Sequence, residues 1–502
     1  MDSILKLLPG FNLNAFLQQF LYDPKNPLLF NNGFFVYFFF FFIVLYYIFK
    51  NNGIARSLIV SVFSLYFFYK ASGLFVGLVL VSAVVDYVLS NLIYRQKSVG
   101  GKKALLALSV VANLGMLFYF KYTNFFIDLC NQFWDAKINP LNIMLPVGIS
   151  FYTFENLSYT IDVYKGEFEP EKKFIHYLLF LSFFPKLMMG PIVRAKDFIP
   201  QLHKPYVVTD DDFAKGFYLI VSGLFKKLVI SDYLTLNLVN YVFDNPGLHT
   251  GLECLVALLA YSVVIYCDFS GYSDVAIGVA RWLGIRIPAN FMSPYQSKSI
   301  TEFWRRWHIS LSSWLKDYLY IFWLGGNRKG KVRTYINLSI TMLLGGFWHG
   351  ANWTFIVWGG MHGGALALHK MWMELTGKAF SKFNNSIVYN LISGVFTYAF
   401  VIFCWIFFKA TNFKIATDFI HQIAYNFSFS VWPEFFGNYK NVIYLMLLGF
   451  VMHFMPDSWA DKMVPRFKRV PLLGYIVVFM GFIAVYSFFK SSTPVMPIYL
   501  QF

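Results

Sequence analysis

The two histidines with the most chemistry to offer are His308 and His349. His308 follows the string WRRW at 304–307, so it lies among cations and indole rings. His349 closes an apolar run that begins at Tyr335. An ionisable side chain inside such a run is costly in a membrane, and it marks a functional-site hypothesis by default. A neutral imidazole can take a proton from a hydroxyl group and return it to a leaving group, which predicts acid–base chemistry here.

Each histidine also has a structural interpretation. His308 could bind an anion together with the neighbouring arginines, or it could anchor the chain at the membrane interface, where Trp and Arg are common. His349 could be a structural histidine that hydrogen-bonds a neighbouring helix. That last interpretation fits better four other histidines, to which we assign no role: His362, His369, His421 and His453.

The depth of His349 follows from helix geometry. If a helix begins near Thr334 at the cytoplasmic face, His349 lies roughly 22 Å along its axis, at about 1.5 Å per residue. The hydrocarbon core of a bilayer is about 30 Å thick. The sequence therefore predicts that the His349 ring lies deep in the membrane.

The elements that position these residues are membrane helices. Hydrophobic residues make up 57% of the 502 residues and charged residues only 14%, whereas a soluble protein carries about 25% charged residues. Long apolar runs such as Phe35–Phe49 exclude the short alternating strands of a barrel. We expect an all-α polytopic membrane protein, with about 10–12 transmembrane or re-entrant helices around a central tunnel.

One membrane domain accounts for most of the chain. Residues 1–31 are expected to form an amphipathic interfacial segment, and residues 32–502 a single transmembrane domain with its catalytic core at about 255–375. Two segments, 140–164 and 174–194, are broken by Pro, Gly and charged residues. Irregular backbone at membrane depth is tolerated where it is covered by protein or lines a cavity, so these segments are either tunnel walls or ordinary kinked helices.

The orientation follows from a basic region. Residues 281–333 contain ten Lys or Arg residues and two acidic residues, Glu302 and Asp317. This excess predicts that the region is cytoplasmic. The formal charge of the whole chain is +16, and contacts with lipid headgroups explain it better than nucleic-acid binding does.

Other chemistry finds little support in the sequence. The four cysteines are scattered and form no CxxC pair, so buried free thiols are expected. Walker, HExxH and complete GxSxG motifs do not occur. The glycines around 345–364 have GxxxG spacings that favour close helix packing over ligand binding. The turn GGNRKGK at 325–331 could contact a phosphate, although a basic surface turn is the simpler interpretation.

Several strings in this chain resemble the membrane-bound O-acyltransferase family, in particular its bacterial branch that O-acetylates polysaccharides. They are SITEFWRRWHISLSSWLKDYLY, LGGNRKG, LLGGFWHGANWTF, LPVGISFYTFENLSYTIDVYKG and the closing IYLQF. The resemblance covers roughly residues 28–502. Phe322-Trp323 departs from the family pattern, as do about 27 additional residues at the start.

The resemblance implies roles for particular residues. His349 matches the catalytic histidine of the family and His308 its second histidine. An acyl thioester donor at the cytoplasmic side is also implied, together with an exported partner of the SGNH-hydrolase type.

From this resemblance and the charge pattern we expect acetyl-CoA as donor substrate, with no bound cofactor and no metal. Its phosphates would meet a basic face formed by Arg281, Arg305, Arg306, Arg328 and Lys329. Asp268, Trp307, Trp348 and Asn352 are expected to line the tunnel.

Two other functions stay open at this point. One is D-alanyl transfer to teichoic acid from a carrier protein, and the other is transport of a polysaccharide or lipid precursor without chemistry. Transporters often show internal repeats, and none is evident here. The acceptor polymer, and the choice between direct transfer and transfer through a partner serine, are not fixed by the sequence.

Overall fold

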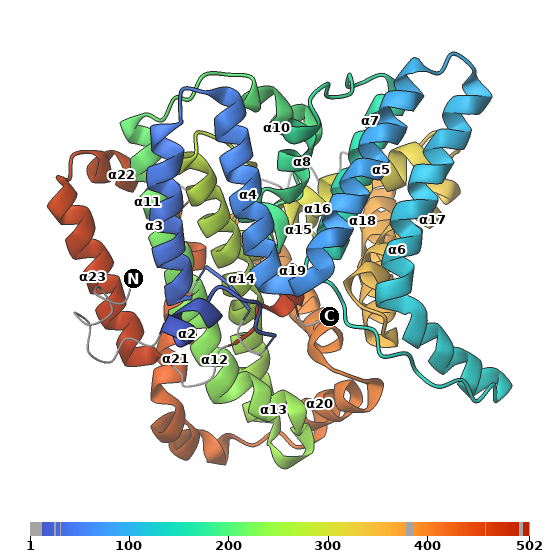
Figure 1. Ribbon diagram of the computed structural model, residues 1–502. Coiled ribbons are helices and arrows are strands. Elements are labelled where there is room, and N and C mark those ends of the chain that lie inside the picture. Colours follow the sequence, from blue (N-terminus) through green and yellow to red (C-terminus); the bar gives the residue numbers. More distant parts are fainter. Residues whose placement is uncertain are drawn as a thin grey trace.

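The computed structural model describes residues 13–24, 27–30, 32–377, 386–456, 458–490 and 495–500, and every regular element within them is a helix (Figure 1). Six helical stretches are long and apolar enough to cross a membrane: 53–95, 99–134, 251–282, 387–409, 429–454 and 472–489. The all-α, multi-pass membrane class predicted from the sequence is confirmed. The amphipathic segment expected over residues 1–31 lies partly outside the described residues.

The N-terminal half begins with α2 (Leu13–Gln18), α3 (Gly33–Ile48), α4 (Gly53–Ser72), η1 (Gly73–Phe75), α5 (Val76–Arg95) and α6 (Val99–Trp134). It continues through α7 (Ile149–Lys165), α8 (Phe174–Ser182), α9 (Phe184–Leu187), α10 (Ala195–Leu202), α11 (Asp210–Leu224), η2 (Phe225–Ser231), α12 (Asp232–Leu234), η3 (Thr235–Val239), α13 (Asn240–Asp244) and η4 (Pro246–Leu248). The chain reverses at η1, so that α5 returns to the side from which α4 came (Figure 1).

The C-terminal half contains α14 (Gly251–Trp282), η5 (Pro294–Gln296), α15 (Ile300–Arg306), α16 (Ile309–Trp314), η6 (Leu315–Trp323), α17 (Lys331–His349) and α18 (Trp353–Thr376). It ends with α19 (Ile387–Lys409), α20 (Phe413–Tyr425), η8 (Phe429–Val431), α21 (Trp432–Phe454), α22 (Ser458–Lys468), α23 (Leu472–Phe489) and η9 (Ile498–Leu500).

The central helix is α14, which is buried along most of its length. A capping box starts it, because Thr250 and Glu253 satisfy each other's free backbone N–H groups. Glycines then let α11 approach it closely. A Cβ atom at Gly271 would lie 2.7 Å from the carbonyl oxygen of Gly223, so the two backbones touch, as small residues permit in membranes.

The pair α17 and α18 is built in the same way. A Cβ atom at Gly346 would lie 2.3 Å from the carbonyl oxygen of Phe355, and one at Gly359 would lie 2.4 Å from that of Met342. The glycine pattern therefore packs helices, as expected from the sequence. This contact fixes the C-terminal end of α17, which carries His349.

The two broken segments are stabilised by polar contacts with each other. Glu155 of α7 forms a buried ion pair with Lys186 of α9, and its other carboxylate oxygen accepts a hydrogen bond from the Val193 backbone N–H, at 3.0 Å. A buried charge is tolerated when it is paired and hydrogen-bonded in this way. These buried contacts join α7, α9 and the connector that follows α9.

Several basic connectors lie together at one end of the molecule, here called the polar end. Tyr164 at the end of α7 contacts Phe322 of η6, and Gln201 of α10 donates a hydrogen bond to the Arg286 carbonyl. Lys331, the first residue of α17, pairs with Glu374 near the end of α18. Helix α17 starts at Lys331, three residues before the start expected at Thr334, and ends at His349. At about 1.5 Å per residue, His349 lies about 27 Å along the helix axis from the polar end.

Candidate functional site

His349 is enclosed by aromatic rings from four segments. It is 3% exposed, and its ring centroid lies 4.9 Å from Trp348, 5.1 Å from Trp358 and 5.1 Å from Phe408. Its distance to the ring centroid of Tyr499 is 5.4 Å. Among the described residues, the Nδ1 atom of His349 has no hydrogen-bond partner. An imidazole nitrogen in this setting is available to a ligand.

The end of α17 is fixed by two side chains of α6. Lys121 donates hydrogen bonds to the carbonyl oxygens of Trp348 and His349, at 2.6 and 2.9 Å. The Tyr122 hydroxyl donates to the Phe347 carbonyl, at 3.1 Å. These carbonyl groups have no partner within their own helix, and a cation there also complements the helix dipole. The backbone that carries His349 is therefore held in place.

His308 sits at a sharp turn between α15 and α16. Its backbone is left-handed, with φ of 43°, a conformation that costs energy for a residue other than glycine. Its Nδ1 atom lies 3.2 Å from Oδ1 of Asn290, which also accepts a hydrogen bond from the Ser310 hydroxyl. The neutral ring therefore carries its proton on Nδ1, and Nε2, which has no partner among the described residues, is the proton acceptor.

The two histidines share neighbours. Trp348 contacts both rings, with centroid distances of 6.4 Å to His308 and 4.9 Å to His349. Tyr499 of η9 also contacts both, at 6.0 and 5.4 Å. Residues 308, 349 and 499 are thus brought together from three distant parts of the chain.

A cavity of about 550 Å³ borders this group at the end of α17 away from the polar end. His349 is not part of its wall, but Phe355 and Phe408 line it and also contact the His349 ring. The wall of the cavity also includes Lys121, Asp268, Gly350, Asn352 and Ile498. Phe355 and Phe408 therefore lie between the cavity and the His349 ring.

The four residues expected to line a tunnel lie in three different places. Asp268 and Asn352 line the cavity; Asp268 also pairs with Lys227 and accepts a hydrogen bond from the Ile498 backbone N–H, at 2.8 Å. Trp348 lies between the histidines. Trp307 packs instead in a buried aromatic cluster against Phe303 and Trp405.

The five cations expected to bind a donor also separate. Arg281 pairs with Asp212, at 2.9 Å, and Arg306 pairs with Glu302, at 2.8 Å. Arg305, Arg328 and Lys329 are exposed, and no ion pair involves them among the described residues. Only these three cations are free to meet a phosphate without first losing a protein partner.

Sequence reasoning missed three contributors to the site. Lys121 was detectable, since it is a lone cation in the apolar run NLGMLFYFKYTNFF. Tyr499 belongs to the closing IYLQF string, to which no role was assigned. Asn290 carries no signal of its own, because its importance depends on its contact with His308.

The fold and the interior histidines define a multi-pass membrane protein with a histidine pair inside its helix bundle. The sequence profile of the membrane-bound O-acyltransferase family matches residues 172–412, which include both histidines. A peptidoglycan O-acetyltransferase of Helicobacter pylori is 36% identical over 379 residues, which cover 70% of this chain and 71% of that protein. The chain therefore belongs to the membrane-bound O-acyltransferase family.

Other relatives carry related names. A probable alginate O-acetylase of Pseudomonas aeruginosa is 44% identical over 332 residues, or 65% of this chain and 61% of that protein. A teichoic acid D-alanyltransferase of Bacillus subtilis is 28% identical over 288 residues, or 55% of this chain and 71% of that protein. The chain spans between 58% and 65% of the length of the Pseudomonas alginate O-acetylases that it matches.

Proposed function

We propose that this protein is an O-acyltransferase that moves an acetyl group across the bacterial inner membrane, for O-acetylation of an extracytoplasmic polysaccharide. The observation that carries the proposal is the contact of His308 and His349 with the same two aromatic side chains, Trp348 and Tyr499, beside a cavity. Family membership and the similarity to O-acetylases of two polymers support it.

In the proposed reaction, the oxygen of an acceptor hydroxyl forms a bond to the acetyl carbonyl carbon while the carbon–sulfur bond of the thioester breaks. His349 takes the hydroxyl proton and returns it to the departing thiolate, so that the products are an ester and free thiol. His308, held by Asn290, orients the thioester or relays the proton. A thioester is already activated, so the step draws only on positioned bases and donors.

The donor is acetyl-CoA, which we place at the polar end. The exposed cations Arg305, Arg328 and Lys329 would attract its phosphates. The basic connectors at this end favour a cytoplasmic location. The acetyl group would then travel through the interior to the histidines.

The acceptor side is the cavity at the other end of α17. An exported protein of the SGNH-hydrolase type would present a serine there, or a polysaccharide would present its own hydroxyl. Alginate is the first polymer to test because of the similarity to alginate O-acetylases.

The test is a thiol-release assay with protein purified in detergent or reconstituted in vesicles. Acetyl-CoA and a D-alanyl-charged carrier protein are supplied in separate reactions, with and without an exported partner and polymer. We expect free CoA and O-acetyl ester to appear together, and no consumption of the charged carrier. Consumption of the carrier alone would favour D-alanyl transfer. Polymer movement into vesicles without thiol release would favour a transporter.

A further inference from the structure

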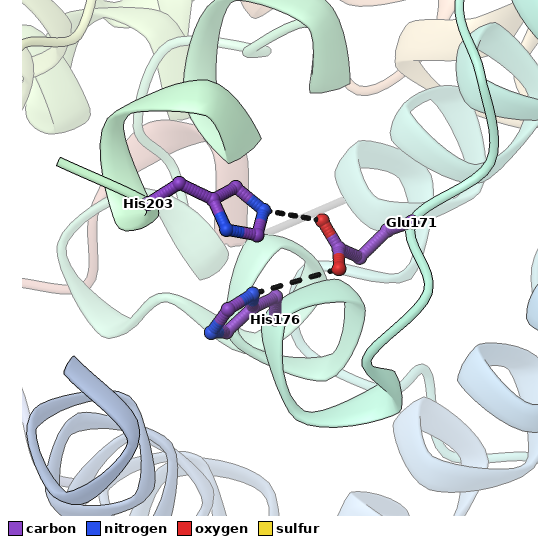
Figure 2. A group of neighbouring side chains, drawn as sticks. All are labelled: Glu171, His176 and His203. Carbon is purple, nitrogen blue, oxygen red and sulfur yellow. Dashed lines mark hydrogen bonds and ion pairs between the residues drawn. The ribbon is translucent and has the colours of Figure 1, made fainter.

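Three side chains outside the histidine pair form a second polar cluster, which no motif in the sequence marks. Glu171, His176 and His203 offer ligand atoms that all lie within 4.8 Å of one another. Figure 2 shows the two imidazole rings next to each other, each facing one oxygen of the Glu171 carboxylate, and their ring centroids lie 4.7 Å apart. Nε2 of His203 lies 2.8 Å from one carboxylate oxygen, and Nδ1 of His176 lies 3.6 Å from the other.

The three residues come from different elements, whose backbones are fixed. Glu171 lies in the connector after α7, and its backbone N–H donates to the Tyr159 hydroxyl, at 3.0 Å. His176 lies in the first turn of α8. His203 follows α10, and Arg56 of α4 donates to the carbonyls on both sides of it, those of Leu202 and Lys204, at 3.2 and 3.0 Å. The ligand atoms thus converge on a rigid frame.

One buried nitrogen of this cluster makes no hydrogen bond among the described residues. His176 is 2% exposed, and its Nδ1 atom makes no hydrogen bond among the described residues although it points at the carboxylate. A buried polar atom in that state is costly and needs an explanation. At 3.6 Å from the carboxylate oxygen, it is too far for a good hydrogen bond and close to the spacing of two ligands on one ion.

The ligand types also suit a metal cation. Two imidazole nitrogens and one carboxylate are donors that divalent transition metals such as zinc bind in proteins.

Space for a further ligand is present beside the cluster. An open groove of about 480 Å³ is lined by His176 and His203, and by Asn51 and Lys173. The His203 side chain is 48% exposed on this side. Lys173 is the positive charge that lines this groove, and a water or an anion in the fourth position would lie between it and the ion.

We propose that Glu171, His176 and His203 bind a divalent transition-metal ion, with Zn²⁺ as the first candidate. Zinc takes imidazole and carboxylate ligands at about 2.0–2.2 Å in a tetrahedron, so its ligand atoms lie roughly 3.4 Å apart. The separations here, from 2.8 Å upward and within 4.8 Å, bracket that value. The ion would join the connector after α7, α8 and α10 at the polar end, apart from the histidine pair.

The test uses the full chain with a tag that contains no histidine, purified in detergent and stripped with a chelator that is then removed. Zn²⁺ is titrated against a chromophoric competitor, and Co²⁺ serves as a spectroscopic probe of tetrahedral coordination. The wild type should bind one equivalent and unfold at a higher temperature as Zn²⁺ rises. His203→Asn and Glu171→Gln should weaken binding by roughly tenfold or more.

A matched control is His249→Asn. His249 faces Glu253 at 3.4 Å, but among the described residues this pair belongs to no three-ligand group. Its substitution should leave affinity unchanged. The proposal is overturned if the wild type binds no stoichiometric Zn²⁺, or if binding survives both cluster substitutions. Because His203 is half exposed, His203→Asn should fold even if Glu171→Gln does not.

Discussion

The molecule holds histidines in two contrasting regions. His308 and His349 are surrounded by aromatic rings, and among the described residues no carboxylate hydrogen-bonds either of them. His176 and His203, by contrast, face the carboxylate of Glu171 at the polar end. An apolar setting favours the neutral imidazole, which accepts a proton, whereas a neighbouring carboxylate favours a positive charge at the imidazole.

The lesson is that the surroundings, more than the residue type, decide what a histidine can do. In the interior pair, aromatic rings surround both histidines, Lys121 holds the backbone carbonyl of His349, and Asn290 holds the ring of His308. At the polar end, the connector after α7, α8 and the residue after α10 hold the polar atoms of Glu171, His176 and His203 within 4.8 Å of one another. If this contrast holds, substitutions near the interior pair should change the rate of acetyl transfer. Substitutions of cations at the polar end should change only the affinity for the charged donor.

The largest effect is expected for His349→Ala. Loss of the proton acceptor should lower the rate of acetyl transfer by about 10²–10⁴-fold. The rate is measured as thiol release and as ester formed on the polymer. His421→Ala, at an exposed position on α20, is the control and should keep the wild-type rate. A folded His349→Ala protein with normal activity would remove the proposed role of this residue.

The second largest effect is expected from a substitution in the contact between α17 and α18, which positions His349. Gly346→Ala places a methyl group 2.3 Å from the Phe355 carbonyl, so α17 and α18 must separate, at a cost of about 1–3 kcal/mol or more. Both the unfolding temperature and the acetylation rate should fall. Gly364→Ala, where nothing lies within 4 Å of the added methyl, should fold normally. Equal behaviour of the two variants would contradict the close packing described here.

A smaller effect is expected from Asn290→Ala. This change leaves the His308 ring and the Ser310 groups without their acceptor, which costs roughly 1–3 kcal/mol for a buried polar group. The pH dependence of the acetylation rate should shift because the tautomer of His308 is no longer fixed. His308→Gln then adds little to the loss in Asn290→Ala, as expected for residues that act as a unit. Full additivity would show that the two residues act separately.

The smallest effect belongs to the polar end. Removal of the unpaired cations in Arg328→Ala/Lys329→Ala should raise KM for acetyl-CoA by roughly 3–10-fold at unchanged kcat, as loss of uniform binding does. The effect should shrink at high salt because exposed charges are screened. Arg281→Ala is the comparison, since its guanidinium is already engaged by Asp212. If Arg281→Ala raised KM more than Arg328→Ala/Lys329→Ala does, Arg281 and not the two exposed cations would be the donor-binding residue.

Much of the fold was predictable from hydrophobic runs, because length and apolarity decide which segments can cross a bilayer. The glycine spacing also indicated close helix contact, which Gly346 and Gly359 confirm. Side-chain pairing was not predictable. The sequence places Arg281 among the cations expected to bind the donor. In the structure, Asp212, which is far away in sequence, forms an ion pair with it. Trp307 was expected at a tunnel and lies in an aromatic cluster, since an indole ring fits either place equally well.

The short helix η9 has a consequence for the order in which the protein is assembled. Tyr499 contacts both histidines, and the Ile498 backbone N–H is bonded to Asp268 of α14. A chain that has inserted every helix through Phe489 would therefore still lack one wall of the histidine pair. The histidine pair is therefore completed only when residues 498–500 dock against α14, so the last part of the described chain closes the site formed by much earlier helices.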